Sequence, residues 1–254
     1  MSAFDPLAAA AGLLASRRAG RRLGGRTTPE TLDEAYAIHD AQARALGQPV
    51  PAWKVSNLTR EQRIRSGFPT PISAPLFAPW TKSSPARFDL AAFVEAPALE
   101  CEFAFQLAVD IPPRPTPYVR EEIVARVAAV RPAIEIVDKR IAEATPVEAL
   151  ADCMASGGFV YGSPIVEWRR LDLSNAAVAL AIDNSRVAWG IGAAVLGDPL
   201  MALVELANAP PPWTRLAAGQ IVTTGSCTGV TTVTGPCTAK ADFGQLGTVE
   251  IRFD

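Results

Sequence analysis

Hydrophobic and polar residues alternate along residues 97–107, which read PALECEFAFQL. Apolar side chains take the odd positions, and polar or small side chains take the even ones. Because successive side chains of a β-strand point to opposite faces, this alternation predicts a half-buried strand with one apolar face. The other face carries Glu100 and Glu102, and no lysine or arginine lies between Glu95 and Asp110 to offset their charges.

Short apolar segments of the same kind, separated by proline and glycine, fill most of the chain after residue 50. They predict further strands at residues 132–138, 158–162, 176–182, 186–189, 220–224, 230–234 and 248–253.

Three segments have the spacing of helices instead. Residues 1–50 read as helical, with one helix running from an N-cap and first-turn proline at Thr28-Pro29 to Gly47. Valine and isoleucine recur at helical spacing within residues 117–130, and an Asp-Pro pair starts a helix at residues 198–208. A strand-rich chain with a helical beginning predicts an α+β fold, with a helical segment at 1–50 and a larger part at 51–254.

Composition excludes several classes of protein. The chain has 254 residues and a net charge of −2, which gives no broad attraction for nucleic acid or an anionic membrane. No apolar run is long enough to span a bilayer. The four cysteines form no C-x-x-C pair, so we expect free thiols in a reducing cytoplasm. Cys227 and Cys237 flank a plausible hairpin, and a disulfide between them is the alternative.

A third acid, Glu135, lies between Ile134 and Ile136 in a short apolar strand. Three glutamates on strands, without a histidine or thiolate pattern, suit a hard divalent cation that takes oxygen ligands. Magnesium fits best, and manganese or calcium is the alternative. The competing interpretation is that Glu100 and Glu102 cover the solvent face of an antiparallel strand.

Two basic features have a functional and a structural interpretation. Lys54 stands between Trp53 and Val55, and partial desolvation lowers the pKa of a lysine toward neutrality and suits it to proton transfer. The alternative is a surface lysine whose stem lies along apolar neighbours. The arginines of residues 17–26 form a cluster that can bind an anion, although a solvated helix end or a subunit contact explains it better. His39, the only histidine, is predicted to be a packed helix residue rather than a base or a ligand.

Taken together, these segments resemble one family. ALECEFAFQLA, PAIEIVDKR, WGIGAAVLGDPLMALVELAN, LAAGQIVTTGS and FGQLGTVEIRF occur in this order in the fumarylacetoacetate hydrolase superfamily. Within it, the chain is most similar to the 2-keto-4-pentenoate hydratases and 4-oxalocrotonate decarboxylases of aromatic catabolism. The resemblance covers nearly the whole chain, and its most specific parts are the E-x-E and P-A-x-E-x-x-D-x-R blocks.

The resemblance implies a fold and a site. The fold is a mixed β-roll with an N-terminal helical segment. Lys54 matches the lysine of a K-x-G-x-T motif and would transfer a proton or orient a bound enol. The implied ligands of Mg²⁺ or Mn²⁺ are Glu100, Glu102 and Glu135, and the implied substrate contacts are Leu76, Arg140 and Ser226.

The implied partner is a small 2-oxo acid rather than nucleic acid or a membrane. The chain is also expected to form a homo-oligomer, with a complex between it and a related decarboxylase or hydratase as a further possibility.

Several positions depart from the family pattern. The glycine after the motif lysine is replaced by Ser56-Asn57, and the acid of an L-F-x-D-M stretch is replaced by Pro79. A D-N-A-S stretch reads Asp-Cys-Met-Ala-Ser at residues 152–156, and Trp189 stands where serine is common. The metal ligands are kept while several substrate-side positions are not, so metal-dependent 2-oxo acid chemistry is better supported than hydration itself.

Four functions are therefore compared. The first is a metal-dependent hydratase that adds water to a 2-hydroxy-2,4-dienoate, and the second is a 2-oxo acid decarboxylase on the same scaffold. A C–C hydrolase is less favoured because it needs a base to activate water, and His39 has a packing explanation. A non-catalytic partner subunit is suggested by the acid lost at Pro79. The three retained glutamates argue against it, because burying carboxylates without a cation is destabilising.

Overall fold

Two mixed β-sheets build the body of the protein in a computed structural model that describes residues 4–25, 29–210, 212 and 215–254. The first sheet has eight strands in the order β2-β1-β10-β5-β6-β7-β3, with β11 paired to β5. Its strands are β1 Ala52–Ser56, β2 Ile72–Leu76, β3 Thr81–Ser83, β5 Ala98–Leu107, β6 Val127–Val137, β7 Ser156–Tyr161, β10 Ile221–Ser226 and β11 Thr231–Thr232.

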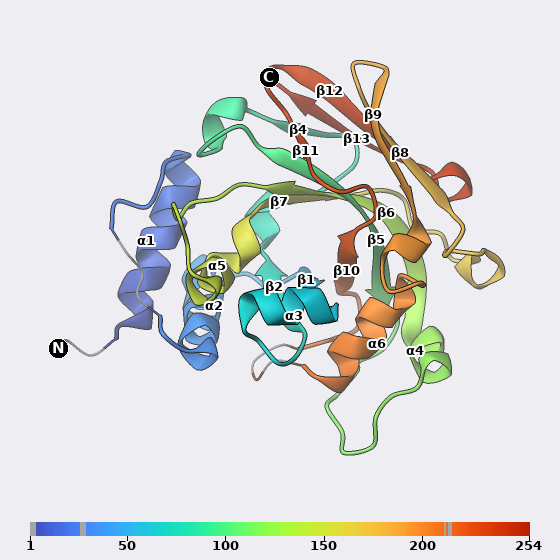
Figure 1. Ribbon diagram of the computed structural model, residues 1–254, viewed down its shortest axis with the longest axis horizontal. Coiled ribbons are helices and arrows are strands. Elements are labelled where there is room, and N and C mark those ends of the chain that lie inside the picture. The colour runs from blue at the N-terminus through green and yellow to red at the C-terminus, as the bar shows by residue number, and fades with distance from the viewer. Residues whose placement is uncertain (1–3, 26–28, 211, 213–214) are drawn as a thin grey trace.

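The second sheet has five strands in the order β4-β13-β12-β8-β9 and lies at the top of the view in Figure 1. Its strands are β4 Ala86–Phe88, β8 Ala177–Ile182, β9 Ser185–Ile191, β12 Cys237–Asp242 and β13 Thr248–Phe253. Phe103 on β5 meets Phe243, which follows β12, edge to face with ring centroids 5.4 Å apart. The apolar faces of the two sheets thus share one core.

The six α-helices of the described chain lie around these sheets. They are α1 Pro6–Ala19, α2 Leu32–Leu46, α3 Arg60–Ser66, α4 Arg120–Arg126, α5 Pro146–Ala151 and α6 Leu200–Asn208. Helices α1, α2 and α5 share a separate apolar cluster on the left of Figure 1. The predicted α+β fold, a mixed β-roll with helices at its N-terminal end, is confirmed.

The two longest strands run antiparallel at the centre of the first sheet. Strand β5 pairs with β6 along its whole length, from Ala98 opposite Val137 to Leu107 opposite Val127. The strand predicted at 97–107 is confirmed. The residues from Cys101 to Phe105 are buried on both faces, however, because the sheet curves around one side of β5 and the core covers the other.

Two helix predictions are wrong in extent. Helix α2 begins at Leu32 because Thr31 and Glu34 form a capping box there, and Thr28 lies outside the described residues. Gly47 does end this helix, in the left-handed conformation. Helix α4 ends at Arg126 because the valines after it pair with β5 in the sheet, where β-branched side chains pack well.

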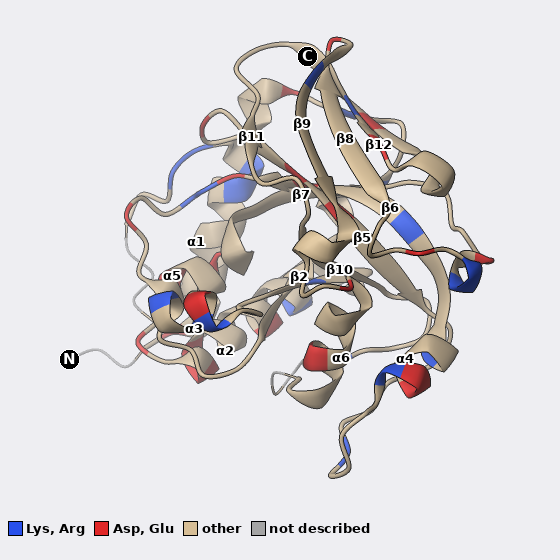
Figure 2. Cartoon of the chain, turned by 45° about the vertical axis from the view of Figure 1, so that its right-hand side comes forward, with Lys and Arg blue, Asp and Glu red and all other residues tan. Residues whose placement is uncertain are grey.

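Acidic and basic residues are interspersed on the outer helices, as α3 and α4 show in Figure 2. Among the described helices, none has the length and apolar character needed to cross a membrane. Arg17, in contrast, is buried. Its guanidinium carbon lies over the ring of Trp80, 4.8 Å from the ring centroid. Burial, and then the charge of Arg140, lowers the pKa of Arg17 to about 10. The solvated helix end expected for the arginine cluster is therefore wrong for this residue.

Candidate active site

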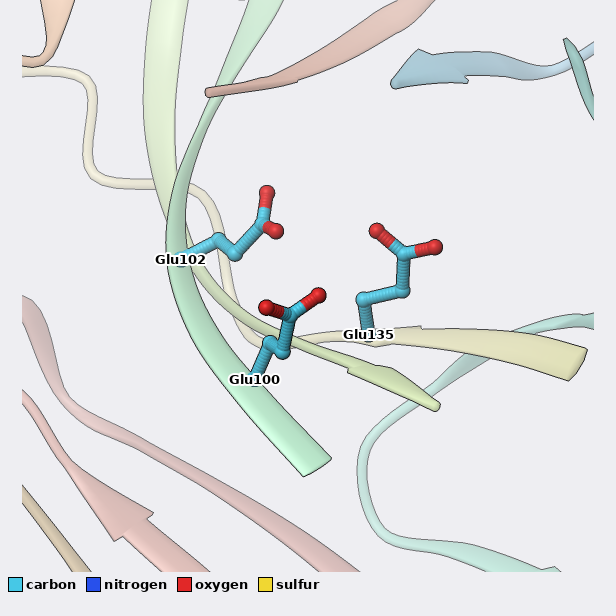
Figure 3. A group of neighbouring side chains, drawn as sticks. All are labelled: Glu100, Glu102 and Glu135. Atoms are coloured by element: carbon cyan, nitrogen blue, oxygen red, sulfur yellow. The ribbon is translucent and has the colours of Figure 1, made fainter. Parts of the chain in front are cut away.

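The pairing of β5 with β6 brings three glutamates together. Glu100 lies directly opposite Glu135, and Glu102 follows two residues later on the same face of β5. One carboxylate oxygen from each lies within 4.8 Å of the other two. Figure 3 shows the three side chains pointing toward one another. We call these three residues the glutamate cluster.

The cluster is mostly hidden from solvent. Glu102 is 2% exposed and Glu135 is 0% exposed. The interpretation of Glu100 and Glu102 as covering a solvent face is therefore wrong for Glu102, while Glu100 is partly exposed. One oxygen of Glu102 accepts hydrogen bonds from the Thr223 hydroxyl and, at 2.9 Å, from the Gly225 backbone N–H. The Oε2 atom of Glu135 is buried and has no hydrogen-bond partner among the described residues.

The electrostatics of the cluster favour a bound cation. Burial, followed by the charges of Glu135 and Glu100, raises the pKa of Glu102 to about 8. Burial and the charge of Glu135 likewise raise the pKa of Glu100. Buried carboxylates that repel one another are destabilising unless a positive charge compensates them. Three carboxylates with one unpaired buried oxygen therefore fit a hard divalent cation.

Lys54, on β1, supplies one positive charge beside the cluster. Its Nζ donates to Glu135 Oε1 at 2.5 Å and to the backbone carbonyl of Met154 at 3.2 Å. The side chain is buried, so the interpretation as a surface lysine is wrong. Burial alone lowers the pKa of Lys54, but the charges of Glu135, Glu100 and Glu102 outweigh it and raise the pKa above its usual value. The predicted shift toward neutrality is wrong, because strands distant in the sequence bring three carboxylates close to the ammonium.

A cavity of about 720 Å³ opens at this point. Lys54 and Glu100 lie in its wall, together with Met154 and Ala155 from the segment after α5. A second cavity of about 290 Å³ shares Ser56, Ala149 and Met154 with the first. The cluster thus borders a space large enough for a small organic acid.

The three expected substrate contacts lie elsewhere. Leu76 is 2% exposed and packs in the apolar interior with Ala52 and Phe159. The Ser226 hydroxyl donates to the Gly229 carbonyl at 2.8 Å, and Arg140 is completely buried. None of these three is among the described residues that line the cavity.

A left-handed turn forms part of the cavity wall, and the sequence gives no indication of it. Cys153, Met154 and Ala155 have φ values of 53°, 53° and 59°. Left-handed backbone at a residue with a side chain is unfavourable by about 1–2 kcal/mol per residue, and consecutive examples are rare. No glycine marks the position, so only tertiary contacts explain the conformation.

His39 and the cysteines have structural roles. His39 is fully buried on α2, with Nε2 2.5 Å from the Leu150 carbonyl, and burial lowers its pKa to about 4. The prediction of a packed helix residue is confirmed. All four cysteines are free, so the disulfide considered between Cys227 and Cys237 is not formed.

Comparison with known proteins identifies the family. No family model matches the chain. A 2-keto-4-pentenoate hydratase from Paraburkholderia xenovorans (strain LB400) is 30% identical over 230 residues, which cover 88% of this chain and 84% of that protein. A 4-oxalocrotonate decarboxylase from Pseudomonas sp. is 27% identical over 257 residues, covering 93% of this chain and 95% of that protein.

A solved structure has the same fold over the full length. The 4-oxalocrotonate decarboxylase from Pseudomonas putida G7, complexed with magnesium and adipate, aligns with a TM-score of 0.88 and 23% identity. The alignment covers 100% of this chain and 99% of that chain. The identity and coverage of the hydratase alignment above show that the chain belongs to the 2-keto-4-pentenoate hydratase family.

Proposed function

We propose that this protein is a divalent-metal-dependent hydro-lyase that adds water to a 2-hydroxy-2,4-dienoate or a related 2-oxo-alkenoate in aromatic catabolism. The observation that carries the proposal is the glutamate cluster, in which the buried Oε2 atom of Glu135 has no partner among the described residues. Lys54 donates to the other oxygen of Glu135, and Lys54 and Glu100 line a cavity large enough for a small organic acid. Three relatives named as 2-keto-4-pentenoate hydratases, each 30–31% identical to this chain, support the reaction type.

Glu100, Glu102 and Glu135 would hold the metal, Mg²⁺ or Mn²⁺. Their oxygen-only donor set favours these ions over Zn²⁺, which is bound more often through histidine and cysteine. When bound, the ion supplies Lewis-acid stabilisation for negative charge that develops on the oxygens of a 2-oxo acid. Magnesium in the decarboxylase structure from P. putida G7 supports this choice.

Lys54 would act on the substrate from the cavity wall. As an ammonium held by the Glu135 carboxylate and the Met154 carbonyl, it has one further N–H available for an oxygen of the substrate. It would orient the bound acid and deliver the proton that moves when water adds to the alkene.

A decarboxylase acting on a 2-oxo acid is the second candidate. The 4-oxalocrotonate decarboxylase from Pseudomonas sp. is nearly as similar to this chain as the hydratases are, at 27% identity over 93% of this chain. The loss of an acid at Pro79 also removes a group that hydration in this family would use. The same metal and lysine would serve both reactions, so only the product separates them.

Assay of the purified protein tests the proposal. The protein is incubated with 2-hydroxypenta-2,4-dienoate and, separately, with a 2-oxo-hexenedioate, with excess chelator or with Mg²⁺, Mn²⁺ or Zn²⁺. We expect loss of the diene absorbance without release of CO₂, complete dependence on Mg²⁺ or Mn²⁺, and poor activity with Zn²⁺. Release of CO₂ as the main product would favour the decarboxylase, and full activity in chelator would contradict both candidates.

The assembly and location of the protein are also proposals. A homo-oligomer, alone or together with a related decarboxylase or hydratase, is tested by light scattering of the purified protein and of the mixture. The free cysteines support a reducing cytoplasmic location.

A further inference from the structure

We propose that Arg140 is a positioning residue for Lys54. Its guanidinium holds the left-handed turn at Cys153–Ala155, and the Met154 carbonyl of this turn fixes the Lys54 ammonium beside the glutamate cluster. The role in turnover rests on the proposed function of the site, whereas the effect on the position of Lys54 does not.

Arg140 closes the turn from both sides. Its Nη2 donates to the carbonyls of Asp152, at 3.1 Å, and Ser156, at 2.8 Å. These two residues flank the three left-handed ones. The Nε atom and the backbone N–H of Arg140 donate to the two carboxylate oxygens of Asp152, at 2.5 Å and 3.1 Å. The planar fork of an arginine can satisfy these acceptors together, whereas a lysine ammonium cannot span them.

Contacts of Asp138 attach the turn to the strand that carries Glu135. Asp138 directly follows the end of β6, and its backbone N–H donates to the Ala155 carbonyl at 2.7 Å. The Asp138 carboxylate accepts from the Val94 N–H at 2.9 Å and lies 3.5 Å from Arg140 Nη1. Asp138 lies three residues after Glu135 in the chain. Its hydrogen bond to Ala155 therefore holds the turn at a fixed distance from Glu135.

Lys54 spans this separation. Its Nζ donates to Glu135 on one side and to Met154 on the other, so the two acceptors together set where the ammonium lies. A left-handed run of residues with side chains persists only where surrounding contacts impose it. Without the Arg140 fork, the turn would relax toward right-handed backbone and the Met154 carbonyl would turn away from Lys54.

The test compares Arg140→Lys with Arg131→Lys. Arg131 lies on β6 and also uses its fork for several acceptors, at Gln106 and the Gly162 carbonyl, but it does not contact the turn. For Arg140→Lys we expect kcat to fall about tenfold or more, since a displacement near 1 Å has effects of this size. We expect KM and the Mg²⁺ dissociation constant to change less than about threefold, because the cluster and the cavity remain. Arg131→Lys should keep the parent kcat.

A second measurement follows Lys54 without any turnover. The protein has four lysines, so acetylation by acetic anhydride can be followed at each of them by peptide mass spectrometry. In Arg140→Lys, acetylation of Lys54 relative to Lys82 and Lys240 should rise several-fold, and in Arg131→Lys it should not. If the parent protein proves inactive on every dienoate, the proposed function fails while this measurement still decides the role of Arg140.

Two further variants keep the test decisive if Arg140→Lys fails to fold. Asp152→Asn weakens the hydrogen bonds between Arg140 and the side chain of residue 152. It should lower kcat and raise Lys54 acetylation as Arg140→Lys does, by a smaller factor. Ala155→Gly, combined with Asp152→Asn, should restore part of kcat because glycine adopts a positive φ without strain. A folded Arg140→Lys or Asp152→Asn protein with parent kcat and parent Lys54 acetylation would overturn the proposal.

Discussion

The two sides of the candidate site are built in opposite ways. The glutamate cluster lies on β5 and β6, where regular strand pairing alone sets Glu100 opposite Glu135. The second acceptor for Lys54, the Met154 carbonyl, lies on the turn Cys153–Ala155, which has three consecutive left-handed residues. One side uses the most favourable backbone geometry available, and the other uses a conformation that its own residues disfavour.

The difference has a physical reason. Metal ligands need a fixed separation, and a strand ladder provides it through its register without any strain. A single carbonyl aimed at Lys54 needs a sharp change of chain direction within a few residues. That geometry is imposed here by the Arg140 and Asp152 contacts rather than by local preference. The turn should therefore be the side of the site that substitutions disturb most easily.

Replacing the residue that joins the two sides should have the largest effect on turnover. Lys54→Met keeps the apolar stem and removes the ammonium, so kcat should fall by about 10² or more, the usual scale of an acid–base contribution. Lys240→Met, at an exposed position on β12, is the matched control and should leave kcat unchanged. Steady-state assays of both variants check this, and unchanged turnover in Lys54→Met would remove Lys54 from the mechanism.

A β-branched residue placed on each side tests the difference in strain. Cys153→Val puts such a residue at φ 53° and should lower the free energy of unfolding by about 1–3 kcal/mol. Cys101→Val is the control on β5, where valine suits the strand, and it should change stability by less. Both cysteines are fully buried, so the added volume is alike. Urea unfolding of the two metal-free variants measures this, and equal losses would show that the turn carries no particular strain.

Substitution by glycine should have the smallest effect on stability, and the effect should differ in sign between the turn and β5. Ala155→Gly relieves a positive φ of 59° and should leave stability unchanged or raise it by up to about 1 kcal/mol. Ala104→Gly, within β5, should lower stability by about 0.5–1 kcal/mol or more because glycine in a strand is unfavourable. Thermal unfolding of both proteins gives the comparison, and a loss in Ala155→Gly as large as that in Ala104→Gly would contradict it.

The same contrast explains how far the sequence predicts the molecule. Alternation around Glu100 and Glu102 predicts β5, and the apolar setting of Glu135 predicts the core of β6. Their register depends on pairing between distant segments, which no local pattern contains. Among the strands that the pattern does not predict, β2 includes Pro75, and the inward residues of β12 are small alanines with little strand preference.

The turn is beyond sequence reasoning for a related reason. Neither glycine nor asparagine marks Cys153–Ala155, so the usual signal of left-handed backbone is absent. The family resemblance implies that Arg140 contacts the substrate, whereas in the structure its buried guanidinium donates to groups of the protein itself. The metal ligands were easier to predict because their residue type and alternation are visible in one segment of the chain.

Calorimetric titration with Mg²⁺ tests the central claim, that the glutamate cluster binds a divalent cation. The proteins compared are the parent, Glu102→Gln and Glu250→Gln, the last a glutamate on β13 outside the cluster. Glutamine keeps the shape of the side chain and removes one negative charge on which an oxygen-only site depends. We expect one Mg²⁺ per chain for the parent and for Glu250→Gln, and an affinity at least about tenfold weaker for Glu102→Gln, which corresponds to about 1.4 kcal/mol of binding free energy. Equal Mg²⁺ affinity in all three proteins would contradict the account.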